Sequence, residues 1–330
     1  MPDGVEIVRG TATLLDVFVE GDAVWVVDSS GVSKFALDAS AGAGPLGRWD
    51  SPRSLLAAAF AGTRLAVADG AKLSVLSADT LELEVDGNVV EPCASVVFVS
   101  GERLVCGPAN DWDRIFYTYD ALTIDLLASS QPFTYNGIPM RKVPGADAFV
   151  TVTTDLSPSD FHLYRLAETG EVVFVGESPY HGDFGVSDVY AFEGDPATQL
   201  VSHEGLLLDF DGCTGQQAAP CFVKNGALGT LPEQRSFLGM ASHADSLFAV
   251  VGNSAYAYEA DCMNTPCRLD RIDVAAREVK DSLSFRLPLQ GIVRLAPRAD
   301  GREVIVGARV AGDRFDTAAR GYFVSRLAFE

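Results

Sequence analysis

Hydrophobic and polar residues alternate in short runs along the whole chain, most clearly over residues 14–37, LLDVFVEGDAVWVVDSSGVSKFAL. Alternation with a period of two predicts β-strands whose side chains point to opposite faces of a sheet. Glu20-Gly21-Asp22 and Asp28-Ser29-Ser30-Gly31 separate the runs, and such glycine and small polar residues favour tight hairpin turns. The stretch therefore predicts three consecutive antiparallel strands.

The same unit recurs along the chain, as its first hairpin turn shows. The turn positions that align are Gly21, Gly62, Gly101, Gly145, Gly194, Ala244 and Gly301, with spacings of 41, 39, 44, 49, 50 and 57 residues. Turns between the third and fourth strands recur in a second register, at Asp38, Ala78, Asp120, Ala167 and Asp273. A repeat of this length is typical of the four-stranded blades of a β-propeller.

The last interval, counted from Gly301 to the C-terminus and on from the N-terminus to Gly21, is 50 residues. The repeat therefore closes across the chain ends, and we expect the N-terminal strand, residues 4–10, to lie beside residues 321–330 and leave no open edge around the circle. We predict an all-β, seven-bladed β-propeller with four-stranded antiparallel blades, as a single domain over residues 1–330. The predicted blades are residues 12–50, 54–87, 94–131, 137–180, 186–229, 235–287, and 291–330 together with 4–10.

Composition agrees with a large β-sheet body. The chain has 330 residues, 48% of them hydrophobic, with 31 Gly and 16 Pro distributed throughout. No apolar run approaches the roughly 18 residues of a membrane-spanning helix, so we expect no membrane insertion. The N-terminal MPDGVEIV lacks the basic start and apolar stretch of a signal peptide.

The six cysteines fall into three near pairs: Cys93 with Cys106, Cys213 with Cys221, and Cys262 with Cys267. Each pair lies on one predicted hairpin or its adjoining loop, where a local disulfide is sterically easy, although six cysteines allow 15 connectivities. Free core cysteines and a zinc site are the alternatives, but no CxxC motif occurs. Disulfides would place the protein in an oxidising compartment, that is periplasm, outer surface or medium, with a leader absent from this sequence.

Charge restricts the partners. The chain has 25 basic and 45 acidic residues, a formal net charge of −20. Such a surface repels phosphate backbones and anionic lipid heads, so nucleic acid and peripheral membrane binding are disfavoured. Simple solubility explains the charge, and a cation, a basic peptide or a basic protein partner is the alternative.

The unit DVFVEGDAVWVVDSSGVSKFALDAS resembles the repeat of bacterial extracytoplasmic β-propellers of the LVIVD and YVTN type. In these repeats an alternating strand, a Gly-Asp turn, an "aYVaD" strand and a "VyDl" strand follow one another. The first two predicted blades carry the pattern best and the fifth departs most. The resemblance implies the fold and an extracytoplasmic location. Its family comprises ligand-binding, adhesion and scaffold proteins with a minority of enzymes.

Two cofactor or repeat types are disfavoured. ALDASAGAGPLGRW resembles the tryptophan-docking repeat of quinoprotein dehydrogenases, but it occurs once, and no adjacent Cys-Cys pair is present. A WD repeat is disfavoured because Trp49-Asp50 and Trp112-Asp113 lack the preceding Gly-His. We therefore expect no cofactor.

A propeller hydrolase or lyase would need a histidine near carboxylates at the mouth of the central channel. Of the four histidines, His162 and His203 fall within or at the end of predicted strands, and His243 lies by a first hairpin turn. Only His181 is placed for catalysis, in Tyr180-His181-Gly182-Asp183-Phe184 between two blades. His181 and Asp183 are the candidate catalytic residues.

Strand alternation puts fourth-to-first connections and second-to-third turns on one face, which we call the loop face. Long acidic loops predict that this face is acidic. Asp111 and Asp113 could supply oxygen ligands to calcium, but they do not complete the six or more ligands of a loop site, so we expect no metal. The predicted binding residues on the loop face are Arg53, Tyr135, Asn136, Tyr180, His181, Asp183, Arg235 and Gln290.

The sequence thus predicts an exported propeller that binds a protein or small-molecule partner through its acidic loop face. Two alternatives stay open: a hydrolase or lyase with His181 as base, and a structural part of a cell-envelope assembly. The last predicts an apolar patch on a blade's outer edge.

Overall fold

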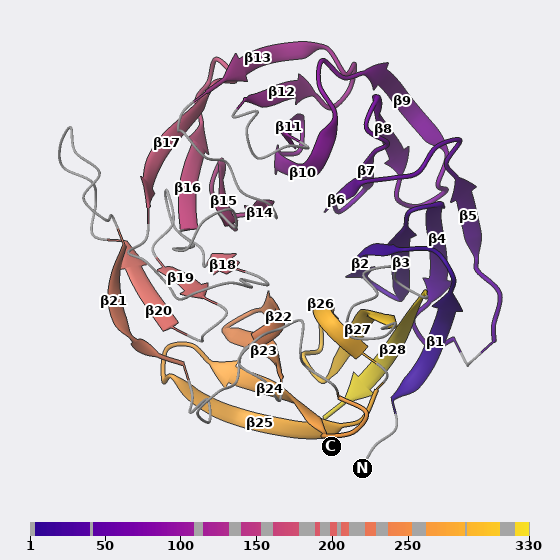
Figure 1. The fold of residues 1–330 in the computed structure, drawn as a ribbon, viewed down its shortest axis with the longest axis vertical. Helices are drawn as coiled ribbons and strands as arrows, with labels where there is room; N and C mark the ends of the chain where they lie inside the picture. The colour runs from indigo at the N-terminus through magenta and orange to yellow at the C-terminus, as the bar shows by residue number, and fades with distance from the viewer. Residues whose placement is uncertain are drawn as a thin grey trace. The chain divides into compact units, whose positions relative to one another are not determined.

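The structure, a computed structural model, describes residues 4–39, 42–108, 115–131, 140–152, 161–177, 189–191, 199–202, 206–210, 222–228, 237–252, 262–287, 289–310 and 321–329. All regular structure in these residues is β-strand, and the strands form antiparallel sheets (Figure 1). The chain divides into two compact units: unit 1, residues 1–52, 203–206 and 227–330, and unit 2, residues 53–202 and 207–226.

Unit 1 contains three four-stranded sheets. The first is β2 (Leu14–Glu20), β3 (Ala23–Asp28), β4 (Gly31–Ala36) and β5 (Gly47–Asp50). The second is β22 (Phe237–His243), β23 (Ser246–Val251), β24 (Cys267–Asp273) and β25 (Glu278–Phe285). The third is β26 (Leu289–Pro297), β27 (Glu303–Val310), β28 (Tyr322–Ala328) and β1 (Val5–Gly10).

The N-terminal strand β1 pairs antiparallel with the C-terminal strand β28, from Val5 opposite Arg326 to Gly10 opposite Tyr322 (Figure 1). This pairing confirms that the first strand completes the sheet of the last three. Both termini are thereby fixed by ladder hydrogen bonds, and β28 is not left as an open edge.

Unit 2 contains two further sheets over residues 57–130 and a third over residues 140–177. They are β6 (Ala57–Ala61), β7 (Arg64–Ala68), β8 (Lys72–Ser77) and β9 (Leu83–Asn88); β10 (Cys93–Ser100), β11 (Arg103–Pro108), β12 (Phe116–Asp120) and β13 (Leu126–Ser130); and β14 (Met140–Lys142), β15 (Ala148–Val152), β16 (Phe161–Leu166) and β17 (Val172–Glu177).

The prediction of a seven-bladed propeller is corrected to six blades whose four strands are all paired in register among the described residues. The remaining strands are β18 (Val189–Ala191), β19 (Gln199–Ser202), β20 (Leu206–Phe210) and β21 (Phe222–Ala227). Six sheets have a residue-by-residue register across all four strands, whereas here it is described only for β18 with β19 and β19 with β20. Glycine, proline and aspartate interrupt the apolar runs of this segment, which keeps its first two strands to three and four residues.

Five of the predicted first hairpin turns have a residue in the left-handed region of the backbone, whereas Gly101, in the β10–β11 turn, does not. Gly21, Gly62, Gly145 and Gly301 have φ of 57°, 60°, 73° and 64°, and Ala244 has φ of 49°. Glycine reaches this left-handed region without steric cost, so the repeat in the sequence is a repeat of the turn that joins the first two strands. Gly194 lies outside the described residues.

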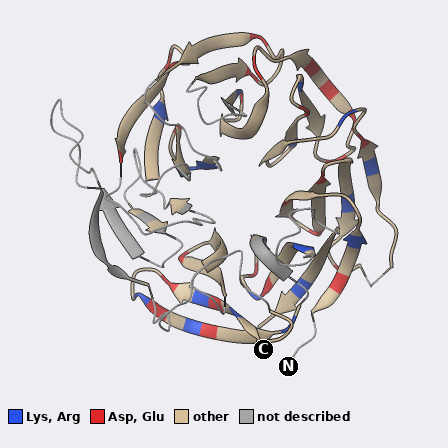
Figure 2. Ribbon diagram, viewed as in Figure 1, with Lys and Arg blue, Asp and Glu red and all other residues tan. Residues whose placement is uncertain are grey.

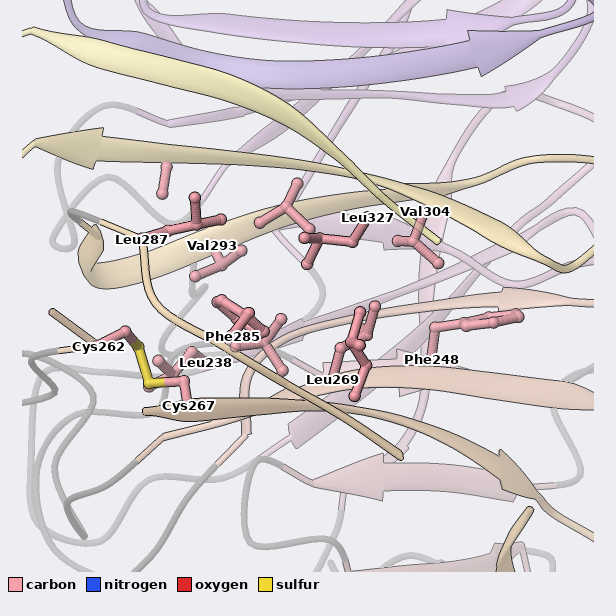
Figure 3. Close-up of a cluster of buried hydrophobic side chains, with 14 of the residues drawn as sticks. Leu238, Phe248, Cys262, Cys267, Leu269, Phe285, Leu287, Val293, Val304 and Leu327 are labelled. Atoms are coloured by element: carbon pink, nitrogen blue, oxygen red, sulfur yellow. A yellow bond between two sulfur atoms is a disulfide. The ribbon is translucent and has the colours of Figure 1, made fainter. Parts of the chain in front are cut away.

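The second strands β3, β7 and β23 are apolar and buried on both faces. β3 and β23 are buried over nearly their whole lengths, whereas the fourth strands β5 and β9 alternate between partly buried and exposed residues. In unit 1 one cluster of buried side chains joins the sheet of β22–β25 to that of β26–β28 (Figure 3). In unit 2 comparable clusters join β6–β9 to β10–β13 and β10–β13 to β14–β17. Each fully buried large side chain contributes about 1.5–3 kcal/mol.

Two predicted disulfides are confirmed, Cys93–Cys106 and Cys262–Cys267, with Cα–Cα distances of 5.4 and 5.0 Å. Both lie in these clusters and are buried, and Figure 3 shows Cys262 and Cys267 beside Leu238. Cys213 and Cys221 lie outside the described residues.

Candidate functional site

Most residues predicted for the loop face lie outside the described residues: Tyr135, Asn136, Tyr180, His181, Asp183 and Arg235, together with Asp111 and Asp113. Gln290 lies in β26, but its side chain is not among those described. Arg53 is described and exposed, and its Nη1 lies 3.8 Å from Oδ2 of Asp69. The roles assigned to these residues stay predictions, and the site is built below from neighbouring strand ends.

Backbone hydrogen bonds place the predicted components of the loop face together within each unit. Ser51, which follows the fourth strand β5, donates its N–H to the carbonyl of Ser30 in the β3–β4 turn at 2.9 Å. In unit 2, Val89 after β9 donates to the carbonyl of Ala71 in the β7–β8 turn at 3.0 Å. In each of these two sheets, the connection that follows the fourth strand is therefore hydrogen-bonded to the turn between the second and third strands.

Asp28, which is 5% exposed, organises the β3–β4 turn. Its Oδ1 accepts hydrogen bonds from the Ser30 N–H at 2.7 Å, the Ser30 hydroxyl at 2.5 Å and the Gly31 N–H at 3.2 Å. Aspartate is suited to this position because its short carboxylate can accept from N–H groups two and three residues further on. The carboxylate holds the turn in one conformation.

Tyr322 on β28 is hydrogen-bonded to the other oxygen of the same carboxylate. Its hydroxyl donates to Oδ2 of Asp28 at 2.8 Å, and the phenol is buried. Burial, together with the neighbouring Asp28 carboxylate, raises the pKa of Tyr322 well above its ordinary value. This contact joins two sheets of unit 1 through a charge-assisted hydrogen bond.

Arg48 on β5 extends the cluster to the surface. Its guanidinium donates to the hydroxyls of Ser30 at 2.9 Å and Ser33 at 2.8 Å, and its Nε donates to Oδ1 of Asp50 at 2.6 Å. The Asp50 side chain is 74% exposed. A continuous hydrogen-bond chain thus runs from the buried Tyr322 to an acidic residue in solvent.

Asp69 performs the same role in unit 2, 41 residues after Asp28. Its Oδ1 accepts from the N–H groups of Ala71 at 3.0 Å and Lys72 at 2.7 Å, which closes the β7–β8 turn. At both positions, the aspartate at the end of the second strand therefore holds the following turn through hydrogen bonds to its backbone N–H groups. Oxygens engaged in this way are poorly placed to serve as metal ligands.

Two arginines of the β26–β28 sheet reach into the neighbouring strand β2. Nε of Arg294 donates to the Leu15 carbonyl at 3.1 Å, and Nε of Arg309 donates to the Leu14 carbonyl at 3.2 Å. Burial lowers the pKa of the Arg309 guanidinium. Sequence reasoning did not identify Tyr322, Arg294 or Arg309, because nothing near them in the chain shows which strand they contact.

His162 is buried in β16, as expected of a structural histidine. Its Nδ1 lies 3.2 Å from the Tyr164 hydroxyl and its Nε2 lies 3.9 Å from Oε2 of Glu177. Phe174 packs edge-on against the ring, with a centroid distance of 5.8 Å. His243 ends β22 at the first hairpin turn, and His203 lies outside the described residues.

Within the described part of the chain, no group of three or more His, Cys, Asp or Glu side chains could hold a metal ion. Among the same residues, no helix is long and apolar enough to span a membrane.

Comparison with known proteins yields the fold. No family model matches the chain, and no curated protein matches it by sequence. Among solved structures, BamB from Moraxella catarrhalis is 11% identical with a TM-score of 0.53, covering 95% of this chain and 96% of BamB. Kuenenia stuttgartiensis hydrazine synthase is 11% identical with a TM-score of 0.64, covering 97% of both chains.

The WD40 β-propeller domain of Doa1 is 12% identical with a TM-score of 0.60, covering 100% of this chain and 97% of that domain. At these identities the similarity shows the fold alone, since propellers with unrelated functions share one architecture. The chain therefore has an all-β propeller fold.

Proposed function

We propose that this protein is an exported binding propeller, and that its acidic loop face holds a protein or small-molecule partner. The observation that carries the proposal is the contrast between the fixed turns of this face and the side chains that its connections expose. Asp28 and Asp69 hold their turns internally, whereas the connections beside the Asp69 turn present Arg53, Leu56 and Val90 to solvent, the last two at 43% and 55% exposure. Rigid strands that present variable loops are a common basis for recognition.

Charge favours a basic or cationic partner. With a net charge of −20, the chain attracts cations over distances of about a Debye length, 8 Å at physiological salt. The exposed apolar residues Leu56 and Val90 add surface that a partner can bury. An extracytoplasmic location is supported by the two buried disulfides, which persist in oxidising compartments.

The test is a thermal-shift screen with calcium chloride, neutral oligosaccharides and lysine-rich peptides, followed by calorimetric titration. A ligand at 100 times its Kd stabilises the folded state by about 2.7 kcal/mol, which raises the Tm of a chain of this length by about 4 °C. The triple variant Tyr180→Ala/His181→Ala/Asp183→Ala should bind the same ligand at least tenfold more weakly, a loss of about 1.4 kcal/mol.

The matched control is Asp245→Ala, an exposed residue in the β22–β23 hairpin turn, the first turn of its sheet. This variant should bind like the unaltered protein. Equal weakening by the control, or no stabilisation by any ligand, would contradict the proposal. Turnover of an ester or glycoside substrate that His181→Ala abolishes would favour the hydrolase alternative instead.

A further inference from the structure

The outer strands of the sheets carry charges, and most of these charges are paired. In β9, Glu84 pairs with Arg64 at 3.0 Å and Asp86 pairs with Lys72. In β25, Lys280 pairs with Asp273 at 2.5 Å and Asp281 pairs with Arg271 at 3.4 Å. Each of these strands is last in its sheet, so its outer backbone groups form an open edge. Charged side chains on an open edge prevent another strand from pairing with it.

The outer strand β13 differs, because its sequence LLASS contains no charged residue. Figure 2 shows the contrast, with β13 tan along its length and red and blue segments on β9 and β25. The exposures are 46% for Leu126, 42% for Leu127 and 46% for Leu122 in the preceding turn. Among the described residues β13 pairs with β12 alone.

Leu127 occupies a bulge position that is charged in two of the other sheets. In β13, Ala128 lies opposite Thr118 and Leu126 lies opposite Tyr119, so Leu127 has no partner in the register. The corresponding unmatched residues are Glu84 in β9 and Lys280 in β25, both in ion pairs. The position that carries a charge in β9 and β25 presents a leucine in β13, and in β17 the corresponding unmatched residue is Val175.

The apolar surface continues onto the next sheet of unit 2. The Val172 N–H donates to the Ser130 hydroxyl at 2.8 Å, and an ideal Cβ on Gly170 would lie 3.3 Å from Cβ of Leu127. Val173, beside them on β17, is 40% exposed. We define the outer-edge patch as Leu122, Leu126, Leu127 and Val173.

Exposed carboxylates border this patch: Asp125 beside Leu126, and Glu168 and Glu171 in and beside the β16–β17 turn. Arg165 is exposed opposite Val173 and is one cation of this rim. Arg103 is a second, since its guanidinium donates to the carbonyls of Ala167 at 3.0 Å and Glu168 at 2.9 Å in the β16–β17 turn. These hydrogen bonds leave the positive charge of Arg103 in place, so three carboxylates and two arginines give the rim a net charge of −1.

We propose that the outer-edge patch is a docking site for an extended segment of a partner protein that has apolar residues at its centre and lysine or arginine at its ends. The segment adds to the free edge of β13 through backbone hydrogen bonds, and its apolar side chains cover Leu126 and Leu127. Its basic ends meet the acidic rim, whereas a second copy of this chain would bring the same carboxylates against it. This surface lies outside the loop face, so the proposal goes beyond the function proposed above.

The test uses two labelled synthetic peptides with the same alternating valine and threonine core, one flanked by lysines and the other by glutamates. Fluorescence anisotropy at physiological salt should show saturable binding of the lysine-flanked peptide and at least tenfold weaker binding of the other. Leu127→Lys, which copies the bulge residue of β25, should weaken binding at least tenfold. Hydrogen exchange should show the backbone amides of residues 126–130 protected by the peptide.

The matched control is Glu84→Lys, a substitution at the corresponding bulge of β9, which should leave binding unchanged. Melting curves check that both variants fold, as expected because Leu127 is largely exposed. The proposal is overturned if the lysine-flanked peptide does not bind, if Leu127→Lys binds it equally well, or if residues 126–130 are not protected. A dimer in sedimentation velocity that Leu127→Lys dissociates would overturn it in favour of self-association. None of these results depends on a ligand at the loop face.

Discussion

Tyr322→Phe tests the link between two sheets of unit 1. The substitution removes one oxygen, which donates a 2.8 Å hydrogen bond to the buried Asp28 carboxylate, and keeps the ring. Oδ1 of Asp28 retains the Ser30 and Gly31 donors, whereas Oδ2 loses the Tyr322 hydroxyl. The variant therefore isolates the contact between strands that lie at opposite ends of the chain.

The expected cost follows from the charge on the acceptor. A hydrogen bond to a charged group contributes about 1.5–3 kcal/mol, and a buried carboxylate oxygen that loses its donor also keeps its desolvation penalty. We expect a loss of about 2 kcal/mol. If the whole chain unfolds together this corresponds to a fall in Tm of about 3 °C. If unit 1, about 160 residues, unfolds separately, the fall is about 6 °C.

Differential scanning calorimetry at neutral pH measures this change, and a double-mutant cycle with Asp28→Asn isolates the pair. Alkaline pH provides a second measurement. The raised pKa of Tyr322 means that the folded state keeps the phenol neutral beyond about pH 10, where the unfolded chain ionises. Its stabilising contribution is complete below about pH 10 and declines above it, so Tyr322→Phe should lose less stability between pH 9 and 10.5 than the unaltered protein.

A fall in Tm below 1 °C, additive effects of Tyr322→Phe and Asp28→Asn, or an unchanged alkaline profile would refute this reasoning. Tyr164, buried in β16, also has a raised pKa because of burial. Some alkaline sensitivity should therefore persist in the Tyr322→Phe variant.

Two further predictions concern stability. Replacing both cysteines of Cys93–Cys106 by alanine should lower the free energy of unfolding by about 3 kcal/mol, and replacing those of Cys262–Cys267 should lower it by about 2 kcal/mol. The first bridge contributes more because it closes a loop of 13 residues and the second a loop of 5. Melting curves with and without reductant should show the larger fall in Tm for loss of Cys93–Cys106. Arg277 and Ile124 have φ of 61° and 58° at equivalent turns between third and fourth strands. Arg277→Gly should be neutral or stabilise the fold by up to about 1 kcal/mol, because glycine relieves the backbone strain of a positive φ. Ile124→Gly should destabilise it by more than about 2 kcal/mol, because the Ile124 side chain is buried, with the residue only 5% exposed. Equal changes in Tm for the two variants would show that backbone strain, not packing, decides the outcome.

Local patterns predicted much of the fold. Alternation predicted the strands, glycine and aspartate predicted the first hairpin turns, and near cysteine pairs predicted two of the bridges, because each feature depends on residues close together in the chain. The predicted count of seven blades was wrong. Around residues 189–227 the apolar runs are short, and the register of β18–β21 depends on pairing that no local pattern specifies.

The candidate site, too, could be predicted from the sequence only in part. The sequence predicted the turn at Asp28 and Gly31 but not the partner of the Asp28 carboxylate, which is 294 residues away. It identified turn registers at Ala78 and Asp120, but not that Leu127 would occupy an exposed bulge where β9 has a paired glutamate.

By itself, then, the sequence determined which residues form strands, where the first turns fall and how acidic the protein is. Only the tertiary structure decided which sheets pack together, which carboxylates clamp turns and which leucines remain in solvent. The physical reason is that hydrogen bonding within hairpins is set by neighbouring residues, whereas burial, charge pairing and desolvation depend on contacts between distant strands.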